Sequence, residues 1–279
     1  MLFYAALNHP KTHDPMQPLV NIAVSAARSA AREIMKAYRR GDVGQIRDKS
    51  RNDFVSEIDH AAEAAIIATI RRAHPDHAIL AEESGASEGR RRSEVEWIID
   101  PIDGTANFIR GLPHFAVSIG CRVRGELAHG VIYDPVKDEL FTASRGDGAQ
   151  LDGRRIRVSR ATQLERALVA TGFAYRRDGD VADHLAAFTR VLETAGDIRR
   201  AGSAALDLAY VAKGRLDGYW ERGLAPWDIS AGLLLVREAG GIATDPDKPD
   251  DNDPMDTGAV IAGSPKIYTS LKEVVTRKN

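Results

Sequence analysis

Between residues 115 and 160 one short pattern repeats, and it limits the possible folds more than any other feature of the chain. The apolar stretches FAVSIGCRV, GVIYDP, ELFTA and RIRVS are separated by Arg-Gly, Asp-Pro, Gly-Asp-Gly and Asp-Gly, which favour turns. Successive strands joined by such short connections pair in antiparallel fashion. We therefore expect an antiparallel sheet in the middle of the chain.

Helical periodicity surrounds this region. Apolar residues recur at helical spacing from Leu19 to Ala37, and Gly41 supplies a stop. Further helices are expected at about 58–73, 181–195, from Gly202-Ser203 onward, 229–239 and 265–276. Short strands are expected at Ala78–Ala81, Trp97–Ile99, ALVATG (167–172), DGYW (217–220) and AVIAG (259–263). Strands gathered in the middle and helices around them predict a layered α+β sandwich rather than a simple doubly wound sheet.

The length of 279 residues allows one large domain or two halves that share an interface. Residues 1–18 hold three prolines and no sustained periodicity, so we expect a dispensable N-terminal extension, with Met16 as the natural start. Residues 19–279 are then predicted to form a single domain, with halves of about 19–160 and 161–279. The acidic stretch 245–256 is interpreted as a solvated loop.

The charges are nearly balanced, with 38 basic and 40 acidic residues. This balance gives no chain-wide attraction to nucleic acid or to an anionic membrane, so we expect neither as a direct partner. No apolar run approaches the ~18 residues of a membrane span, and the first residues do not resemble a signal peptide. The single cysteine, Cys121, is expected to pack in the core. Together these features predict a cytoplasmic protein.

The segment WIIDPIDGTANF (97–108) carries the strongest chemical signal. A predicted strand ends at Asp100, Pro101 turns the chain, and Asp103 brings a second carboxylate close to the first. Their repulsion must be relieved by protonation or by a cation, and carboxylates suit Mg²⁺. Gly104-Thr105 opens a helix whose first amides favour a phosphate. The alternative is an ordinary turn in which Asp103 only caps a helix.

Further acidic residues lie at the ends of other apolar segments. Asp59 follows NDFVSE, Glu82 and Glu83 follow a predicted strand, and Asp228 begins an apolar helix. Each has a simpler explanation, which is helix capping for Asp59 and Asp228 and a solvated loop for the glutamates. Their recurrence at segment ends favours a shared site.

Three motifs in order carry a resemblance to a known family. These are the Glu-Glu after a strand, W-x-I-D-P-I-D-G-T-x-N-F, and W-D-x-x-A-G-x-x-x-x-x-E-A-G-G; the stretch GSAALDLAYVAKGRLDGYWE (202–221) adds a fourth match. The chain after Met16 resembles the inositol monophosphatases, a family of lithium-sensitive, magnesium-dependent phosphatases, and most closely the bacterial inositol-1-monophosphatases. The resemblance implies a five-layered αβαβα sandwich of the sugar-phosphatase type, a homodimer, and hydrolysis of inositol monophosphate by a metal-activated water.

The resemblance also implies two or three Mg²⁺ ions. Glu82, Asp100 and the carbonyl of Ile102 are expected to hold one ion. Asp100, Asp103 and Asp228 are expected to hold a second, and Glu82 is expected to contact a weaker third ion through water. No covalent nucleophile is needed.

The other implied roles concern water and substrate. Thr105, supported by Asp59, is expected to orient and help deprotonate the attacking water. The Gly104 and Thr105 amides are expected to hold phosphate oxygens. The residues expected to contact ring hydroxyls are Glu221, Asp103 and the turn Gly202-Ser203-Ala204. Two positions depart from the family pattern, since Ala106 and Ser56 stand where many relatives have Thr.

Other substrates and another class of role stay open at this stage. Relatives with the same metal core act on fructose 1,6-bisphosphate or 3′-phosphoadenosine 5′-phosphate. The nucleotide-cleaving relatives commonly carry an insertion where this chain has Asp100 only 18 residues after Glu82, which argues against that activity. Some bacterial relatives also join the complex that prevents premature termination of ribosomal RNA transcription, so a transcription-elongation complex is a possible partner.

Overall fold

The computed structural model describes residues 17–42, 44–50, 53–87, 93–173 and 181–277. Residues 1–16 of the predicted extension lie outside these ranges. Its last two residues do not belong to an extension, because helix α1 spans Gln17–Arg40 and includes Pro18. A proline is tolerated in the first turn of a helix, where the amide has no intrahelical partner.

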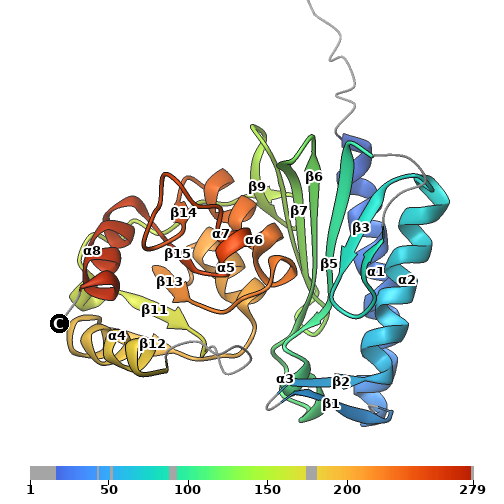
Figure 1. Cartoon of the computed structure of the whole chain (residues 1–279), viewed down its shortest axis with the longest axis horizontal. Helices are drawn as coiled ribbons and strands as arrows, with labels where there is room; N and C mark the ends of the chain where they lie inside the picture. Colours follow the sequence, from blue (N-terminus) through green and yellow to red (C-terminus); the bar gives the residue numbers. More distant parts are fainter. Residues whose placement is uncertain (1–16, 43, 51–52, 88–92, 174–180, 278–279) are drawn as a thin grey trace, which may run out of the picture.

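Two sheets organise the chain (Figure 1). The larger has eight strands in the order β10-β9-β8-β7-β6-β5-β3-β4, and all its pairings are antiparallel except β3 with β5. Its strands are β3 (Ala78–Ala81), β4 (Gly85–Ser87), β5 (Val95–Asp103), β6 (Ala116–Val123), β7 (Glu126–Asp134), β8 (Glu139–Ser144), β9 (Gly148–Leu151) and β10 (Arg154–Arg155). The predicted antiparallel meander is confirmed from β6 onward.

The smaller sheet is mixed and has the order β12-β11-β13-β15-β14. Its strands are β11 (Leu168–Thr171), β12 (Asp197–Arg199), β13 (Gly218–Glu221), β14 (Ile242–Thr244) and β15 (Val260–Gly263). Strand β11 pairs in parallel with β12 and β13, whereas β15 is antiparallel to both neighbours. A separate hairpin joins β1 (Ile46–Ser50) to β2 (Asp53–Ser56).

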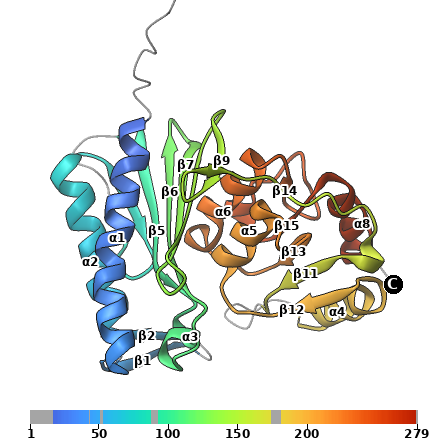
Figure 2. The ribbon, with the colours of Figure 1, turned by 180° about the vertical axis from the view of Figure 1, so that it is seen from behind.

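Helices form the remaining three layers, as Figures 1 and 2 show from opposite sides. Helices α1 and α2 (Glu57–Ala73) cover the outer face of the large sheet. Helices α5 (Ala204–Lys213) and α6 (Pro226–Glu238) lie between the sheets, and α4 (Val181–Thr194) and α8 (Pro265–Thr276) cover the small sheet. Short helices α3 (Thr105–Ile109), η1 (Leu164–Arg166) and α7 (Pro254–Thr257) complete the chain. The predicted α+β sandwich with αβαβα layering is confirmed.

The central position of α5 and α6 follows from their sequences. Every residue from Asp228 to Val236 is buried, because a helix between two sheets has no face left for water. The two helices pack so closely that a Cβ at Gly232 would lie 2.5 Å from Leu208 Cδ1. No helix in the described ranges is long and apolar enough to cross a membrane.

Two sequence interpretations of loops and strands were wrong. The stretch RIRVS forms a strand only at its start, because Val158 leaves the sheet and donates its amide to the Ala239 carbonyl at the end of α6. The acidic stretch 245–256 is not simply solvated. The Asp245 side chain is buried and accepts the amides of Asp247 and Lys248, so this carboxylate holds the turn that leads to α7.

Candidate active site

Strand β5 brings Asp100 and Asp103 to the same side of the sheet through a bulge. Its register against β6 shifts between Asp100↔Ser118 and Asp103↔Ala116, so one extra residue lies on β5. Without that residue, two positions three apart would point to opposite faces. The predicted strand end at Asp100 was therefore wrong, since the strand continues to Asp103. Pro101 lies in the bulge, where its missing amide is tolerated.

Three carboxylates form the centre of the candidate site. Oxygen atoms of Asp100, Asp103 and Asp228 lie within 4.8 Å of one another, and all three residues are buried. The pKa of Asp100 lies well above its ordinary value, first because of burial and then because of the negative charges of Glu82, Asp103 and Asp228. This buried, all-oxygen group of like charges fits a hard divalent cation such as Mg²⁺, which would relieve both the repulsion and the desolvation.

Asp103 also connects the two halves of the chain. Its Oδ2 accepts a hydrogen bond from Ser203 Oγ at 2.5 Å and one from the Ala205 amide at 2.7 Å. Ser203 is the N-cap of α5 and its Oγ accepts the Leu206 amide. The carboxylate at the end of β5 is thus fixed by the first turn of a helix about 100 residues later in the chain.

Asp228 is both a helix cap and a member of the acidic cluster. Its Oδ2 accepts the Ala225 amide at 2.7 Å, and Pro226 occupies the first turn of α6. The capping and cluster interpretations of Asp228 are therefore compatible, because one carboxylate can satisfy an amide and face its acidic neighbours at once.

Asp59 shows the same double use. Its Oδ2 accepts the Ser56 amide at 2.9 Å and the Ser56 hydroxyl at 2.5 Å, which forms a capping box at the start of α2. Its Oδ1 lies 3.0 Å from Thr105 Oγ1, which is also 3.0 Å from the Ile102 carbonyl oxygen. Burial raises the pKa of Asp59 despite these hydrogen bonds, which makes it a better proton acceptor than an ordinary aspartate.

Gly104 allows the chain to turn from β5 into α3. Its φ is 99°, and a Cβ there would lie 3.0 Å from the His114 carbonyl oxygen and 3.3 Å from that of Gly202. Both the backbone conformation and the close approach require glycine. The amides of Gly104 and Thr105 lie at the start of a helix, where no earlier carbonyl of the same helix can accept them.

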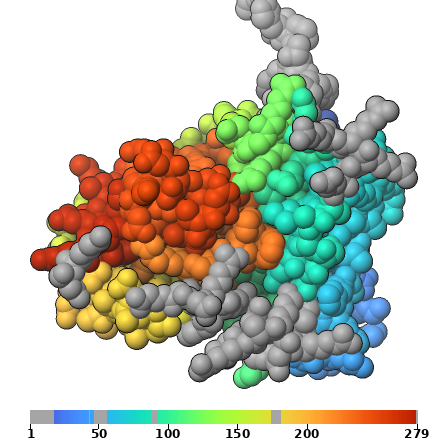
Figure 3. Space-filling view, in the orientation of Figure 1, coloured from blue at the N-terminus to red at the C-terminus, as the bar shows by residue number. Residues whose placement is uncertain are grey.

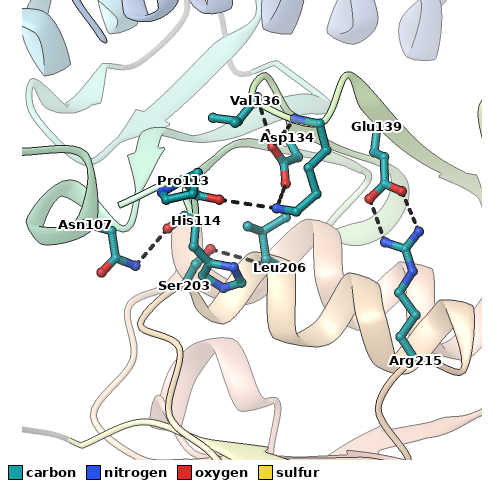
Figure 4. Close-up of polar contacts among 10 residues, drawn as sticks. Asn107, Pro113, His114, Asp134, Val136, Glu139, Ser203, Leu206 and Arg215 are labelled. Carbon is teal, nitrogen blue, oxygen red and sulfur yellow. Dashed lines mark hydrogen bonds and ion pairs between the residues drawn. The ribbon is translucent and has the colours of Figure 1, made fainter. Parts of the chain in front are cut away.

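Polar contacts around this turn, drawn in part in Figure 4, were not predicted from the sequence. Asn107 Nδ2 donates to the His114 carbonyl at 2.8 Å and to the Ala201 carbonyl at 2.9 Å, so it joins α3 to the segment before α5. Farther along, Arg215 forms two hydrogen bonds with Glu139 and ties the end of α5 to β8. These contacts hold the two halves in one arrangement.

Glu63 is a further residue that the sequence interpretation missed. It is buried on α2, and its two carboxylate oxygens accept the amides of Glu83 and Ser84 at 2.8 and 2.9 Å. The turn that carries Glu82 is therefore fixed by a carboxylate from another element. The sequence did contain a signal for Glu63, because a charged residue on the inner face of a helix usually has a specific partner.

A cavity of about 630 Å³ adjoins the acidic cluster at the junction of the two halves. Figure 3 shows orange atoms of the C-terminal half lying directly against green and teal atoms of the N-terminal half. Most of the residues predicted to contact the substrate line this cavity. Its lining includes Asp103, Gly104, Gly202, Ser203, Ala204, Glu221 and Asp228 from the predicted set, and also Arg110, Arg200 and Asp207. The remaining predicted residues, Asp59, Glu82, Asp100, Ile102 and Thr105, are connected to this set by the contacts and charges described above.

The far side of the cavity is acidic. The Tyr219 hydroxyl donates to Glu221 Oε2 at 2.6 Å. Burial raises the pKa of Asp207 well above its ordinary value, and the charges of Glu221 and Asp103 raise it further. Asp207 was missed in the sequence, although an acidic residue inside the apolar stretch AALDLAY was a signal that could have identified it.

Comparisons with known proteins agree with this geometry. The pattern of the inositol monophosphatase family matches residues 15–278. The chain is 49% identical to the Nus factor SuhB of Escherichia coli over 256 residues, which covers 92% of this chain and 95% of that protein.

Two solved structures extend the match to the fold. The extragenic suppressor protein suhB of Bartonella henselae is 40% identical, with a TM-score of 0.89 over 94% of this chain and 100% of that one. The inositol monophosphatase of Anabaena is also 40% identical, with a TM-score of 0.82 over 94% and 96%. These likenesses support a phosphatase of this type. The chain belongs to the inositol monophosphatase family.

Proposed function

We propose that this protein is a Mg²⁺-dependent phosphomonoesterase that hydrolyses inositol monophosphate to inositol and phosphate. The observation that carries the proposal is the convergence of Asp100, Asp103 and Asp228 within 4.8 Å beside a cavity with hydroxyl-accepting groups on its far side. Family membership supports the reaction class and the choice of substrate, and the acidic cluster supports the choice of Mg²⁺.

In this proposal two groups of oxygen ligands would hold two ions. Glu82, Asp100 and the Ile102 carbonyl would hold one, and Asp100, Asp103 and Asp228 would hold the other. Glu82 would also serve a third, weaker ion. When bound, Mg²⁺ supplies positive charge that lowers the pKa of water and offsets the charge of the phosphoryl oxygens. The carboxylates themselves set the positions of these charges, because hydrogen bonds hold Asp103 and Asp228 in place.

Thr105 and Asp59 orient the attacking water. The Thr105 hydroxyl donates to Asp59 Oδ1, so its oxygen lone pairs are directed away from Asp59 and can accept a hydrogen from water. The water oxygen forms a bond to phosphorus as the ester P–O bond breaks. The proton that water loses passes toward the Thr105–Asp59 pair, and the departing inositol oxygen takes a proton from solvent.

The substrate is held at both ends. The Gly104 and Thr105 amides donate to phosphate oxygens at the start of α3. At the other end, Glu221, Asp103 and the turn Gly202-Ser203-Ala204 receive the ring hydroxyls. An ionised carboxylate only accepts hydrogen bonds, so Glu221 selects for a hydroxyl-bearing group rather than a second phosphate.

Fructose 1,6-bisphosphate remains the alternative substrate, because Arg110 and Arg200 also line the cavity and could contact a second phosphate. A panel assay decides between them. Phosphate release is measured with inositol monophosphates, fructose 1,6-bisphosphate, 3′-phosphoadenosine 5′-phosphate and a simple aryl phosphate, each with Mg²⁺ and with excess EDTA. Inositol monophosphate should give the highest kcat/KM, and undiminished turnover in EDTA would disprove the metal dependence.

The protein is proposed to act as a homodimer. Val181, Leu185 and Leu192 expose 57%, 48% and 58% of their surface along one side of α4, and such an apolar stripe is suited to a self-complementary contact. Light scattering on the purified protein tests this. A Leu185→Glu/Leu192→Glu variant should dissociate if the stripe forms the contact.

A role in transcription is a separate proposal. It is supported by the similarity to the Nus factor SuhB of Escherichia coli. Capture of RNA polymerase and elongation factors by the tagged protein tests it, with the inactive Asp228→Asn variant as a control that separates binding from catalysis.

A further inference from the structure

The outer side of α1 carries a row of basic side chains that the phosphatase site does not use. Arg28, Arg32, Lys36, Arg39 and Arg40 are all exposed. Within the described residues, none of the five forms an ion pair. Like charges one helical turn apart repel, so the row lowers helix stability in the isolated protein. A partner of opposite charge would remove this repulsion.

These side chains line a groove rather than a flat surface. The groove has a volume of about 750 Å³ and lies between α1 and the turn that follows β7. Tyr133 and Pro135 form part of its wall, and Arg28 lies over the Tyr133 ring at 5.4 Å from the centroid. Asp138 is the only acidic residue of the lining, and it accepts a hydrogen bond from the Tyr133 hydroxyl at 2.6 Å.

The charges repeat along the groove. Positions 28, 32, 36 and 40 recur every four residues, so each charge advances about 6 Å and the row spans about 18 Å. This row is longer than a single phosphate group needs, and its repeat suits the successive phosphates of an extended chain. Four of the five residues are arginines, whose guanidinium forks match phosphate oxygens.

A nucleic-acid strand fits this groove better than an amphipathic peptide helix does. Peptide helices dock through several apolar anchors in apolar pockets. Here the apolar lining residues Ala31, Tyr133 and Pro135 are buried, and only Met35 and Val136 are partly accessible. The surface offered to a partner is therefore mainly cationic, as in proteins that follow a phosphate backbone.

We propose that the α1 groove binds the phosphate backbone of a single-stranded nucleic acid, independently of phosphatase activity. The near-neutral net charge of the whole chain led us to expect no such binding, but net charge does not report the local concentration of cations on one helix face. The surface is also concave, and a concave groove fits a planar membrane poorly.

The test measures binding of a fluorescein-labelled 12-nucleotide single-stranded RNA by anisotropy at several salt concentrations. Binding through the five cations predicts that log K falls with log salt with a slope of about −3.5, at about −0.7 per neutralised phosphate. The Arg32→Gln/Arg39→Gln variant should bind at least tenfold more weakly, and the magnitude of its slope should fall by about 1.4. Phosphatase activity should stay unchanged, and the melting temperature should not fall, because two charges are removed from a row whose members repel one another.

A matched control is Lys266→Gln/Arg277→Gln, which removes the same charge at α8, at the opposite end of the molecule (Figure 1). It should bind RNA like the wild type. Equal losses in both double variants would show that bulk charge is responsible and would overturn the proposal. Absence of binding at low salt, or displacement of the RNA by a polyglutamate peptide of equal charge, would also overturn it. A DNA oligonucleotide of the same sequence distinguishes the two nucleic acids.

Discussion

The Tyr219 hydroxyl lies 2.6 Å from Glu221 Oε2, and the carboxylate that it holds lies directly over Gly172. A Cβ at Gly172 would approach Glu221 Oε1 to 2.1 Å, so a larger residue there would displace this carboxylate from its present position. The Tyr219 hydroxyl thus holds Glu221 in place before any substrate enters, and Gly172 leaves the space that the carboxylate occupies. Preorganisation of this kind removes an ordering cost from binding.

Tyr219→Phe should lower kcat/KM for inositol monophosphate roughly tenfold, because a hydrogen bond to a charged group contributes about 1.5–3 kcal/mol and only the orientation of Glu221 is lost. Hydrolysis of a simple aryl phosphate should change less than twofold. Steady-state kinetics on both substrates measures this difference. A parallel loss on both substrates would show that Tyr219 supports the fold and not the selectivity.

Glu221→Gln should also lower kcat/KM for inositol monophosphate more than kcat/KM for the aryl phosphate. The loss should be larger than the loss caused by Tyr219→Phe. Loss of a charged acceptor for ring hydroxyls is expected to cost on the order of 1.5–3 kcal/mol, which corresponds to a roughly 10- to 100-fold loss of inositol phosphate selectivity. If Tyr219 acts through Glu221, the double variant should be no worse than Glu221→Gln alone. Additive losses would contradict that dependence.

Asp228→Asn should reduce turnover by more than about 100-fold, which exceeds the usual effect of changing an outer partner of a metal ligand. The fold should persist, because the side-chain oxygen of asparagine can still accept the Ala225 amide. Phosphate release at saturating Mg²⁺ and thermal melting test the two parts. Near-normal activity would remove Asp228 from the proposed metal site.

The raised pKa of Asp207 predicts a pH dependence of stability. The folded pKa lies above the ordinary value of 3.8, so the folded state binds more protons, and stability falls as pH rises from about 3.8 through the folded pKa. Asp207→Asn removes this penalty. Its melting temperature should exceed that of the wild type at pH 8, and the difference should vanish toward pH 4.

Melting curves across this pH range check the sign, with exposed Asp197→Asn as the control. The pKa of Asp197 is lowered, chiefly by its hydrogen bond with Arg199, so its replacement should not raise stability at pH 8. A stabilisation of Asp207→Asn that is equal at pH 4 and pH 8 would mean that packing, and not charge, is responsible.

Local patterns in the sequence predicted much of the fold. Helix α8 spans Pro265–Thr276, close to the expected 265–276, because proline opens it and its apolar spacing is regular. Strands β12 and β14 were missed, since three-residue strands carry too little periodicity to stand out. Strand β5 was predicted too short because proline usually ends a strand, and a bulge is decided by the partner strand β6.

The candidate site, like the fold, was predicted from the sequence only in part. Asp100, Asp103 and Asp228 could be selected because motif spacing and resemblance identify them, and the structure brings them together. Tyr219 and Gly172 could not, because their relation to the site depends on contacts across β11 and β13. Contacts between two strands that are distant in the chain produce no repeating pattern in the sequence of either strand. The roles of all these residues in catalysis stay predictions until the variants are measured.

The attachment of Asp103 to the first turn of α5 makes the amide of Ala205 a natural reporter. This amide donates to Asp103 Oδ2 at 2.7 Å, so its hydrogen exchange reports how often the carboxylate and the helix part. A cation that restrains Asp103 should slow this exchange, and so should a substrate whose ring hydroxyls contact the same carboxylate. Binding at this carboxylate could then be followed without a spectroscopic label and without turnover.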